Sequence, residues 1–114
     1  MKPMTKRPFH DKEAKAIRIA SNLLKTSFPV KEVILFGSKA RGDDDRESDI
    51  DLLVLTTVNV TYSLRKQIID ALFDIEQQFD VALSPLIVSR DEWRKGPLTA
   101  LLIYDTVKEE GVAV

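Results

Sequence analysis

The chain has 114 residues, 44% of them hydrophobic and 31% charged, which is enough for one compact domain with a modest core. Its formal net charge of -1 gives no electrostatic reason to expect duplex nucleic acid as a partner, since proteins that bind it usually carry a strong basic excess. The lack of cysteine excludes disulfides and thiolate metal sites. The single histidine, His10, argues against a histidine-based metal site or catalytic triad.

Nothing in the sequence indicates insertion into a membrane. The first eight residues, MKPMTKRP, lead into no apolar segment of the kind found in secretory signals, and no apolar run reaches about 18 residues. We therefore expect a cytoplasmic protein. Residues 1–9 are expected to form a flexible tail and residues 10–114 a single domain, because no linker-like or repeated segment divides them.

Hydrophobic periodicity predicts an alternation of helices and strands. Residues 10–27 place apolar side chains at helical spacing, which predicts an amphipathic helix that ends before Pro29. Two short apolar runs, 30–36 and 50–57, are rich in β-branched residues. They predict strands buried on both faces.

The second half of the chain continues this alternation. Residues 62–79 predict another amphipathic helix, capped near Thr61 or Ser63. Residues 81–89 predict a third strand, and Pro85 within it points to an edge position or a bulge because proline has no N–H to donate.

The last segment is predicted to be helical. A short turn over residues 90–96 leads to Pro97 at a plausible first helical position, and Gly111 is expected to end the helix. The order helix, strand, turn, strand, helix, strand, helix indicates an α/β sheet domain.

Asp49 and Asp51 are the first candidates for chemistry. Residues two apart in a strand point to the same face, so both carboxylates are expected to project together where the second strand begins. Two adjacent negative charges are unfavourable unless a cation lies between them, and Mg²⁺ or Mn²⁺ accepts carboxylate oxygens while keeping positions for phosphate. Solvated acids at a strand edge are the alternative interpretation.

Gly37 and Ser38 strengthen the metal-site interpretation. They follow a predicted buried strand and open a tight turn or short helix, where bare N–H groups and a hydroxyl can hold a phosphate. Gly37 and Gly42 also match the glycines of a P-loop, but Asp43 and Asp44 stand where that motif needs lysine and serine or threonine.

Phosphates at this turn would lie beside a metal held by Asp49 and Asp51, which is the arrangement that phosphoryl or nucleotidyl transfer requires. The acids within residues 43–47 are expected to form a solvated loop.

The sequence resembles a known family at this point. GSKARG (37–42) followed by SDIDLLVL (48–55) is similar to the GSxARG…SDxDLLV signature of the DNA polymerase β-like nucleotidyltransferase superfamily. Its smallest members are the minimal nucleotidyltransferases, and the similarity runs from the first predicted strand to the end of the chain.

The resemblance implies a mixed sheet of three or more strands flanked by helices. It also implies Mg²⁺ (or Mn²⁺), ATP as substrate, and transfer of a nucleoside monophosphate to an acceptor hydroxyl. Matched by position, Gly37 and Ser38 would contact the triphosphate, while Asp49 and Asp51 would be the catalytic, metal-holding residues. Arg41 would either help with phosphate charge or shape the loop.

The resemblance further implies a partner. Minimal nucleotidyltransferases typically pair with a small all-helical protein of the HEPN class in a toxin–antitoxin module, in which the nucleotidyltransferase acts as antitoxin and adenylylates the toxin. The sequence also leaves open whether the chain forms a homo-oligomer.

The chain departs from the family pattern at the third strand. Ser84 stands where the family normally has a third carboxylate, which helps to bind metal and can act as the base. Asp80 lies four residues upstream, roughly 13 Å away along a strand. It is either a displaced substitute or the turn residue between helix and strand.

Three functions stay open from the sequence. The leading one is an active nucleotidyltransferase of the antitoxin type. The second is a catalytically impaired nucleotide-binding module that neutralises a helical partner by binding, which Ser84 favours. The third is a nucleotidyltransferase for a small-molecule hydroxyl, completed by a separate subunit.

Overall fold

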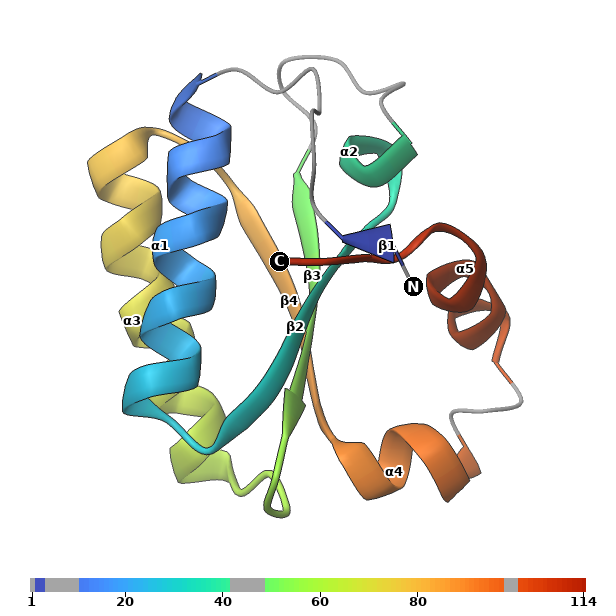
Figure 1. Ribbon diagram of the computed structural model, residues 1–114. Helices are drawn as coiled ribbons and strands as arrows, with labels where there is room; N and C mark the ends of the chain where they lie inside the picture. Colours follow the sequence, from blue (N-terminus) through green and yellow to red (C-terminus); the bar gives the residue numbers. More distant parts are fainter. Residues whose placement is uncertain (1, 4–10, 42–48, 98–100) are drawn as a thin grey trace.

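The computed structural model describes residues 2–3, 11–41, 49–97 and 101–114, and its helices and strands alternate along the chain except near the C-terminal end, where two helices follow one another (Figure 1). The helices are α1 (Asp11–Ser27), α2 (Ser38–Arg41), α3 (Tyr62–Phe79), α4 (Arg90–Lys95) and α5 (Leu102–Glu110). The strands are β1 (Lys2–Pro3), β2 (Val30–Phe36), β3 (Ile50–Thr56), β4 (Leu83–Ser89) and β5 (Val112–Ala113).

The strands form one mixed sheet in the order β1-β5-β2-β3-β4. β2 is antiparallel to β3, whereas β3 is parallel to β4, and α3 makes the crossover between these two parallel strands. β5 pairs with β2 over only two residues. The predicted α/β class, a small mixed sheet flanked by helices, is confirmed.

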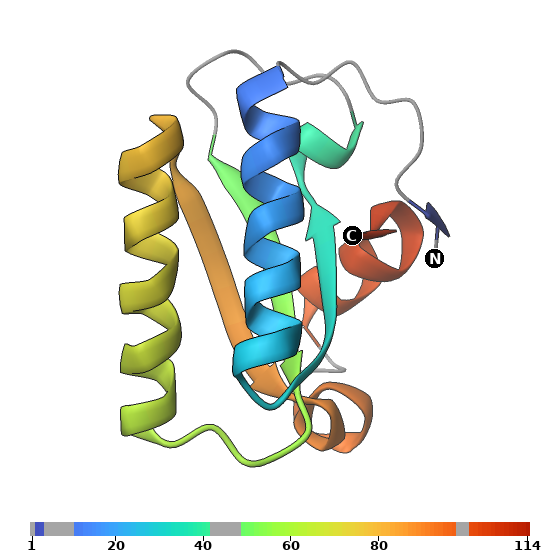
Figure 2. The ribbon, with the colours of Figure 1, turned by 60° about the vertical axis from the view of Figure 1, so that its left-hand side comes forward.

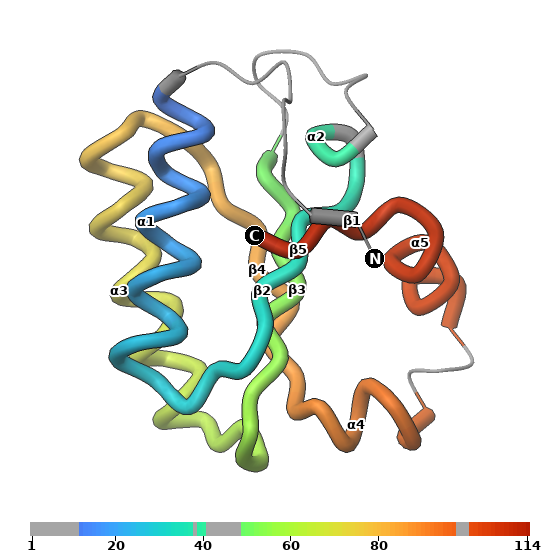
Figure 3. Tube along the Cα trace, viewed as in Figure 1, coloured from blue at the N-terminus to red at the C-terminus, as the bar shows by residue number. Residues whose placement is uncertain are grey.

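Both faces of the central strands are covered, as the tube in Figure 3 shows. Ile50 and Leu52 of β3 belong to a core beneath α1 and α3, which pack side by side (Figure 2). Leu53 points to the other face and joins Trp93 of α4 and Val107 of α5 in a second, smaller cluster. This two-sided burial explains why the strands read as continuous apolar runs.

The outer edge of β4 is protected against further strand pairing. Pro85 lies in this edge strand, as predicted, and has no N–H to offer. On either side of it, the N–H of Leu83 donates to the Glu76 carboxylate at 2.9 Å, and the Arg65 guanidinium donates to the Ile87 carbonyl at 3.2 Å. Side chains of α3 thus occupy backbone groups that another strand would need.

Two predictions for the C-terminal half were wrong. Residues 90–96 were expected to form a turn, but Arg90–Lys95 is a helix, whose first turn is capped by the Ser89 hydroxyl accepting from the Glu92 N–H at 3.1 Å. The final helix begins at Leu102 rather than at Pro97. A six-residue helix spans fewer than two turns, so it leaves no periodic signal in the sequence.

The two short strands were also missed. Val112–Ala113 pairs with β2 after Gly111 ends α5, as the glycine predicts. Lys2–Pro3, within the segment expected to be a flexible tail, pairs with β5. Residues 4–9 and His10 lie outside the described residues. Among the described helices, none combines the length and apolar character that a membrane span requires.

Thr61 caps α3, and its loss should be measurable. Its hydroxyl accepts from the Leu64 N–H at 3.1 Å, so Thr61→Ala is expected to lower the free energy of unfolding by about 1 kcal/mol. Chemical denaturation measures this change, and Thr61→Ser, which keeps the hydroxyl, is the matched control. Equal denaturation midpoints for the alanine and serine variants would contradict the assignment.

Candidate active site

Gly37 turns the chain from β2 into α2. Its φ of +79° lies in the left-handed region that residues with a side chain rarely adopt. A Cβ built at this position would also overlap the carboxylate of Asp51, with the carboxyl carbon only 3.2 Å away. Glycine is therefore required both for the backbone angle and for the close approach of this acid.

Asp49 and Asp51 flank the buried Ile50 where β3 begins. Asp51 is half-buried and pairs in register with Phe36, the last residue of β2, whereas Asp49 is exposed and immediately precedes the strand. Because Ile50 points into the core under α1 and α3, Asp51 points to the opposite face. The structure thus brings Asp51 against Gly37 at one end of the sheet.

Ser84 is the cross-strand neighbour of Asp51. The two residues are paired in the parallel ladder between β3 and β4, so their side chains lie on the same face at the same end. Ser84 is exposed. A carboxylate at position 84 would complete a cluster with Asp49 and Asp51, but serine cannot supply that charge. Among the described residues, no group of three or more histidine, cysteine, aspartate or glutamate side chains could hold a metal.

Asp80 is the turn residue after α3, not a strand residue. It is the C-cap, with left-handed φ and ψ of 53° and 54°, and its N–H donates to the Glu76 carbonyl. Its fully exposed carboxylate lies 3.7 Å from the Lys12 ammonium, and Lys12 also donates to the Asp80 carbonyl at 3.2 Å. The strand begins three residues later at Leu83, so Asp80 does not replace the missing acid.

Ser38 and Arg41 are the first and last residues of α2. The backbone therefore places both directly after Gly37. Their side chains, Gly42 and residues 43–47 lie outside the described residues, so the predicted phosphate contacts and the solvated acidic loop stay predictions.

The donors present suit a hard divalent cation. Asp49 and Asp51 offer carboxylate oxygens, one exposed and one half-buried, and Asp51 lies against the turn at Gly37. Mg²⁺ is commonly bound by one or two carboxylates and completes its shell with water and substrate phosphates. The two aspartates therefore fit Mg²⁺ or Mn²⁺ as part of a metal–triphosphate complex.

A buried ion pair that the sequence analysis missed supports the turn. The Lys39 ammonium, in α2, pairs with the Glu13 carboxylate of α1, and both side chains are almost completely buried. Lysine and glutamate are rarely buried unless paired. The pair links the helix after Gly37 to α1. Its signal in the sequence was weak, because Glu13 lies among charged residues and Lys39 in a motif position where any residue is allowed.

Comparison with known proteins agrees with this geometry. The model of the nucleotidyltransferase domain family matches residues 17–114, which include Gly37 and both aspartates. The chain therefore belongs to the nucleotidyltransferase family of enzymes.

Two curated relatives come from Methanocaldococcus jannaschii. The provisionally named protein adenylyltransferase MJ0604 is 35% identical over 85 residues, which cover 73% of this chain and 80% of the relative. The provisionally named protein adenylyltransferase MJ0141 is 38% identical over 82 residues, covering 72% of this chain and 76% of the relative.

Solved structures show the same fold at lower identity. A toxin–antitoxin complex with AMP-PNP contains a chain that matches with a TM-score of 0.57 and 19% identity, over 91% of this chain and 72% of that one. A mutant of the toxin–antitoxin MntA–HpeT contains another, with a TM-score of 0.56 and 18% identity over 86% and 70%. At these identities the likeness supports the shared fold.

Gly37→Ala tests the close approach of turn and acid. The added methyl group would force Asp51 aside and strain the backbone, so we expect at least about a tenfold loss of affinity for Mg²⁺ and an ATP analogue that is not hydrolysed. Calorimetric titration measures the affinity, and circular dichroism checks that the variant folds. Unchanged affinity in a folded variant would contradict this role for Gly37.

Proposed function

We propose that the chain is a Mg²⁺-dependent adenylyltransferase that transfers AMP from ATP to a hydroxyl of a small all-helical HEPN-type toxin, and so acts as its antitoxin in the cytoplasm. The observation that carries the proposal is the approach of the Asp51 carboxylate to Gly37, which would bring the proposed metal ligand beside the proposed phosphate-binding turn. The names of the two archaeal relatives and of the toxin–antitoxin structures support the acceptor class.

The proposed roles follow from the positions of the residues. The acceptor oxygen would attack the α-phosphorus, a new phosphorus–oxygen bond would form, and the bond to the β-phosphate would break to release pyrophosphate. The turn at Gly37 and Ser38 would orient the β- and γ-phosphates, and Asp49 and Asp51 would hold Mg²⁺. The bound metal would neutralise charge that develops during the transfer.

The acceptor hydroxyl must lose its proton to a base during the transfer. Ser84 does not act as a general base at ordinary pH, and Asp80 is engaged at the end of α3. The proton would therefore pass to water or to a base that the partner contributes. This predicts slow transfer by the chain alone and faster transfer in the complex.

The second candidate function is neutralisation by binding alone. Serine beside Asp51, in place of the third carboxylate, is the specific observation that favours it. In that case the chain would bind Mg²⁺ and ATP but would block its helical partner sterically.

One experiment separates the two candidates. The purified chain is incubated with ATP labelled at the α-phosphate, Mg²⁺ and a lysate from its source, beside the Asp49→Asn/Asp51→Asn variant. The proposal predicts a labelled small protein with the wild type and none with the variant. The same variant is then tested for suppression of the partner's toxicity in cells. Full suppression without labelling would favour neutralisation by binding.

A further inference from the structure

The end of the sheet opposite Gly37 carries a second concave surface, which the proposed reaction does not use. A hollow of about 240 Å³ opens between the sheet, α4 and α5, and we call it the α4–α5 hollow. It is lined by Glu32, Ile34, Leu55, Arg90, Trp93, Arg94, Tyr104 and Lys108. On β2, Glu32 and Ile34 precede Gly37 by five and three residues, so these lining residues lie roughly 16 and 10 Å from it along the strand.

The α4–α5 hollow combines an apolar floor with a basic rim. Ile34, Leu55 and Trp93 are buried, with Trp93 only 6% exposed, and they form the floor. Three cations and one acid make up the charged groups around it. An anionic ligand with an apolar part would therefore match both features of the surface.

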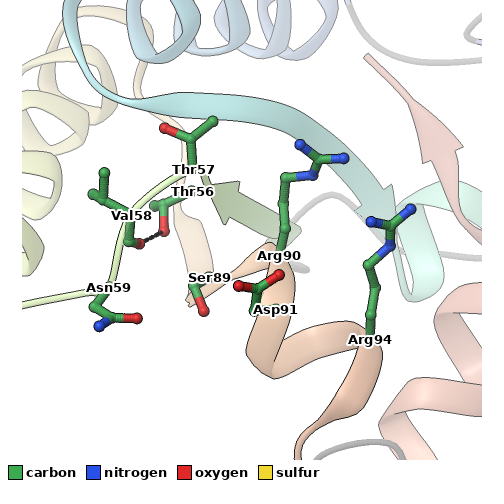
Figure 4. Close-up of a pocket in the computed structure, with 8 residues that line it drawn as sticks. All are labelled: Thr56, Thr57, Val58, Asn59, Ser89, Arg90, Asp91 and Arg94. Atoms are coloured by element: carbon green, nitrogen blue, oxygen red, sulfur yellow. Dashed lines mark hydrogen bonds between the residues drawn. The ribbon is translucent and has the colours of Figure 1, made fainter.

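Arg90 and Arg94 are the centre of the basic rim. They lie one helical turn apart on α4, and Figure 4 shows both side chains extending in the same direction. Both also line an adjoining hollow of about 140 Å³ at the ends of β3 and β4, together with Asp91. Within the described parts of the chain, no carboxylate forms an ion pair with either arginine or with Lys108.

The aromatic side chains argue against a nucleobase as the ligand. Trp93 packs against Tyr104 with ring centroids 4.9 Å apart, and the Lys108 ammonium lies over the Tyr104 ring at 5.4 Å from its centroid. Neither ring presents the open, flat platform on which a base stacks. The hollow is also smaller than the roughly 300–1,000 Å³ of typical small-molecule sites.

We propose that the α4–α5 hollow binds an acidic segment of a partner polypeptide. Two carboxylates of that segment would pair with Arg90 and Arg94, whose planar guanidinium groups can each donate two parallel hydrogen bonds to a carboxylate, and an apolar side chain between them would cover Trp93. Arginine, tryptophan and tyrosine are the residues that most often anchor protein–protein interfaces. Glu32 gives the rim one acceptor for a backbone N–H of the segment.

The test is a selection of displayed random short peptides on the 114-residue chain, with the Arg90→Gln/Arg94→Gln variant used for counter-selection. We expect enrichment of peptides with at least two acidic residues beside a large apolar one. A synthetic peptide with an enriched sequence is expected to bind the wild type at least about tenfold more tightly than it binds the Arg90→Gln/Arg94→Gln variant. Lys15→Gln/Arg18→Gln removes two positive charges from the exposed side of α1 and should leave this affinity unchanged.

Three results would overturn the proposal: no enrichment of acidic peptides, equal affinity for wild type and the Arg90→Gln/Arg94→Gln variant, or an equal loss in the α1 control. Inorganic tripolyphosphate is measured in parallel. Its binding to wild type but not to the arginine variant, without any acidic peptide being enriched, would instead identify a phosphate site.

The outcome is independent of the proposed transfer reaction. Arg90 and Arg94 lie far from Gly37, so their replacement should not change the affinity for Mg²⁺–ATP. A failed peptide selection with intact labelling from ATP would overturn only the docking surface, and the reverse result would overturn only the transfer.

Discussion

Replacing Asp51 with asparagine is expected to lower the rate of nucleotidyl transfer about 100- to 1000-fold, because a metal ligand that stabilises the transition state contributes several kcal/mol. Asparagine has nearly the same shape as aspartate, so it should keep the contact with Gly37 while losing the charge that holds Mg²⁺. The measurement is the initial rate of label transfer from ATP at saturating Mg²⁺.

Asp74→Asn provides the matched control, since Asp74 is an exposed acid on α3, away from the site. It undergoes the same chemical change and should keep the wild-type rate. A thermal melt of the Asp51→Asn variant close to that of the wild type would show that the loss is not caused by unfolding. Equal rates for the two variants would remove Asp51 from the proposed mechanism.

The largest effect on stability is expected at the buried ion pair. Lys39→Met leaves the Glu13 carboxylate buried without its ammonium partner, and breaking such a pair typically costs about 3–5 kcal/mol. This is a large part of the roughly 5–15 kcal/mol that stabilises a domain. Chemical denaturation followed by circular dichroism measures the loss.

The double variant Lys39→Met/Glu13→Leu separates an unpaired charge from a packing defect. Removing both charges should recover most of the stability, because well-packed apolar replacements of buried pairs are often neutral. If the pair positions α2 and the turn at Gly37, the single and the double variant are both expected to show a higher KM for ATP than the wild type. No recovery of stability in the double variant would show that a packing defect around Lys39, and not the unpaired charge of Glu13, causes the loss.

The sequence predicts the elements with strong periodicity well. The strand over residues 30–36 and the helix over residues 62–79 begin and end as expected, because both have a clear hydrophobic pattern and a cap or glycine at one end. Pro85 pointed to an edge position or a bulge for β4, and the strand lies at the edge of the sheet. Elements too short to show a hydrophobic repeat, such as α4 and β5, could not be predicted from the sequence pattern.

Only part of the candidate site could be predicted from the sequence. Gly37 and the two aspartates carry a motif, so their proximity could be inferred from chemistry and from family resemblance. The pairing of Lys39 with Glu13 could not be inferred from the sequence. The two residues are 26 positions apart, and their burial depends on how α1 packs beside α2. The family pattern put Ser84 at the position of the third carboxylate, and the ladder between β3 and β4 makes it the neighbour of Asp51.

The most direct test of the central proposal compares ATP labelled at the α-phosphate with ATP labelled at the γ-phosphate, in the presence of the co-purified helical partner and Mg²⁺. Nucleotidyl transfer predicts that the partner gains label only from the α-phosphate, together with one released pyrophosphate and a mass increase equal to one AMP. Label from the γ-phosphate alone, or no modification of the partner with either substrate, would contradict the proposed reaction.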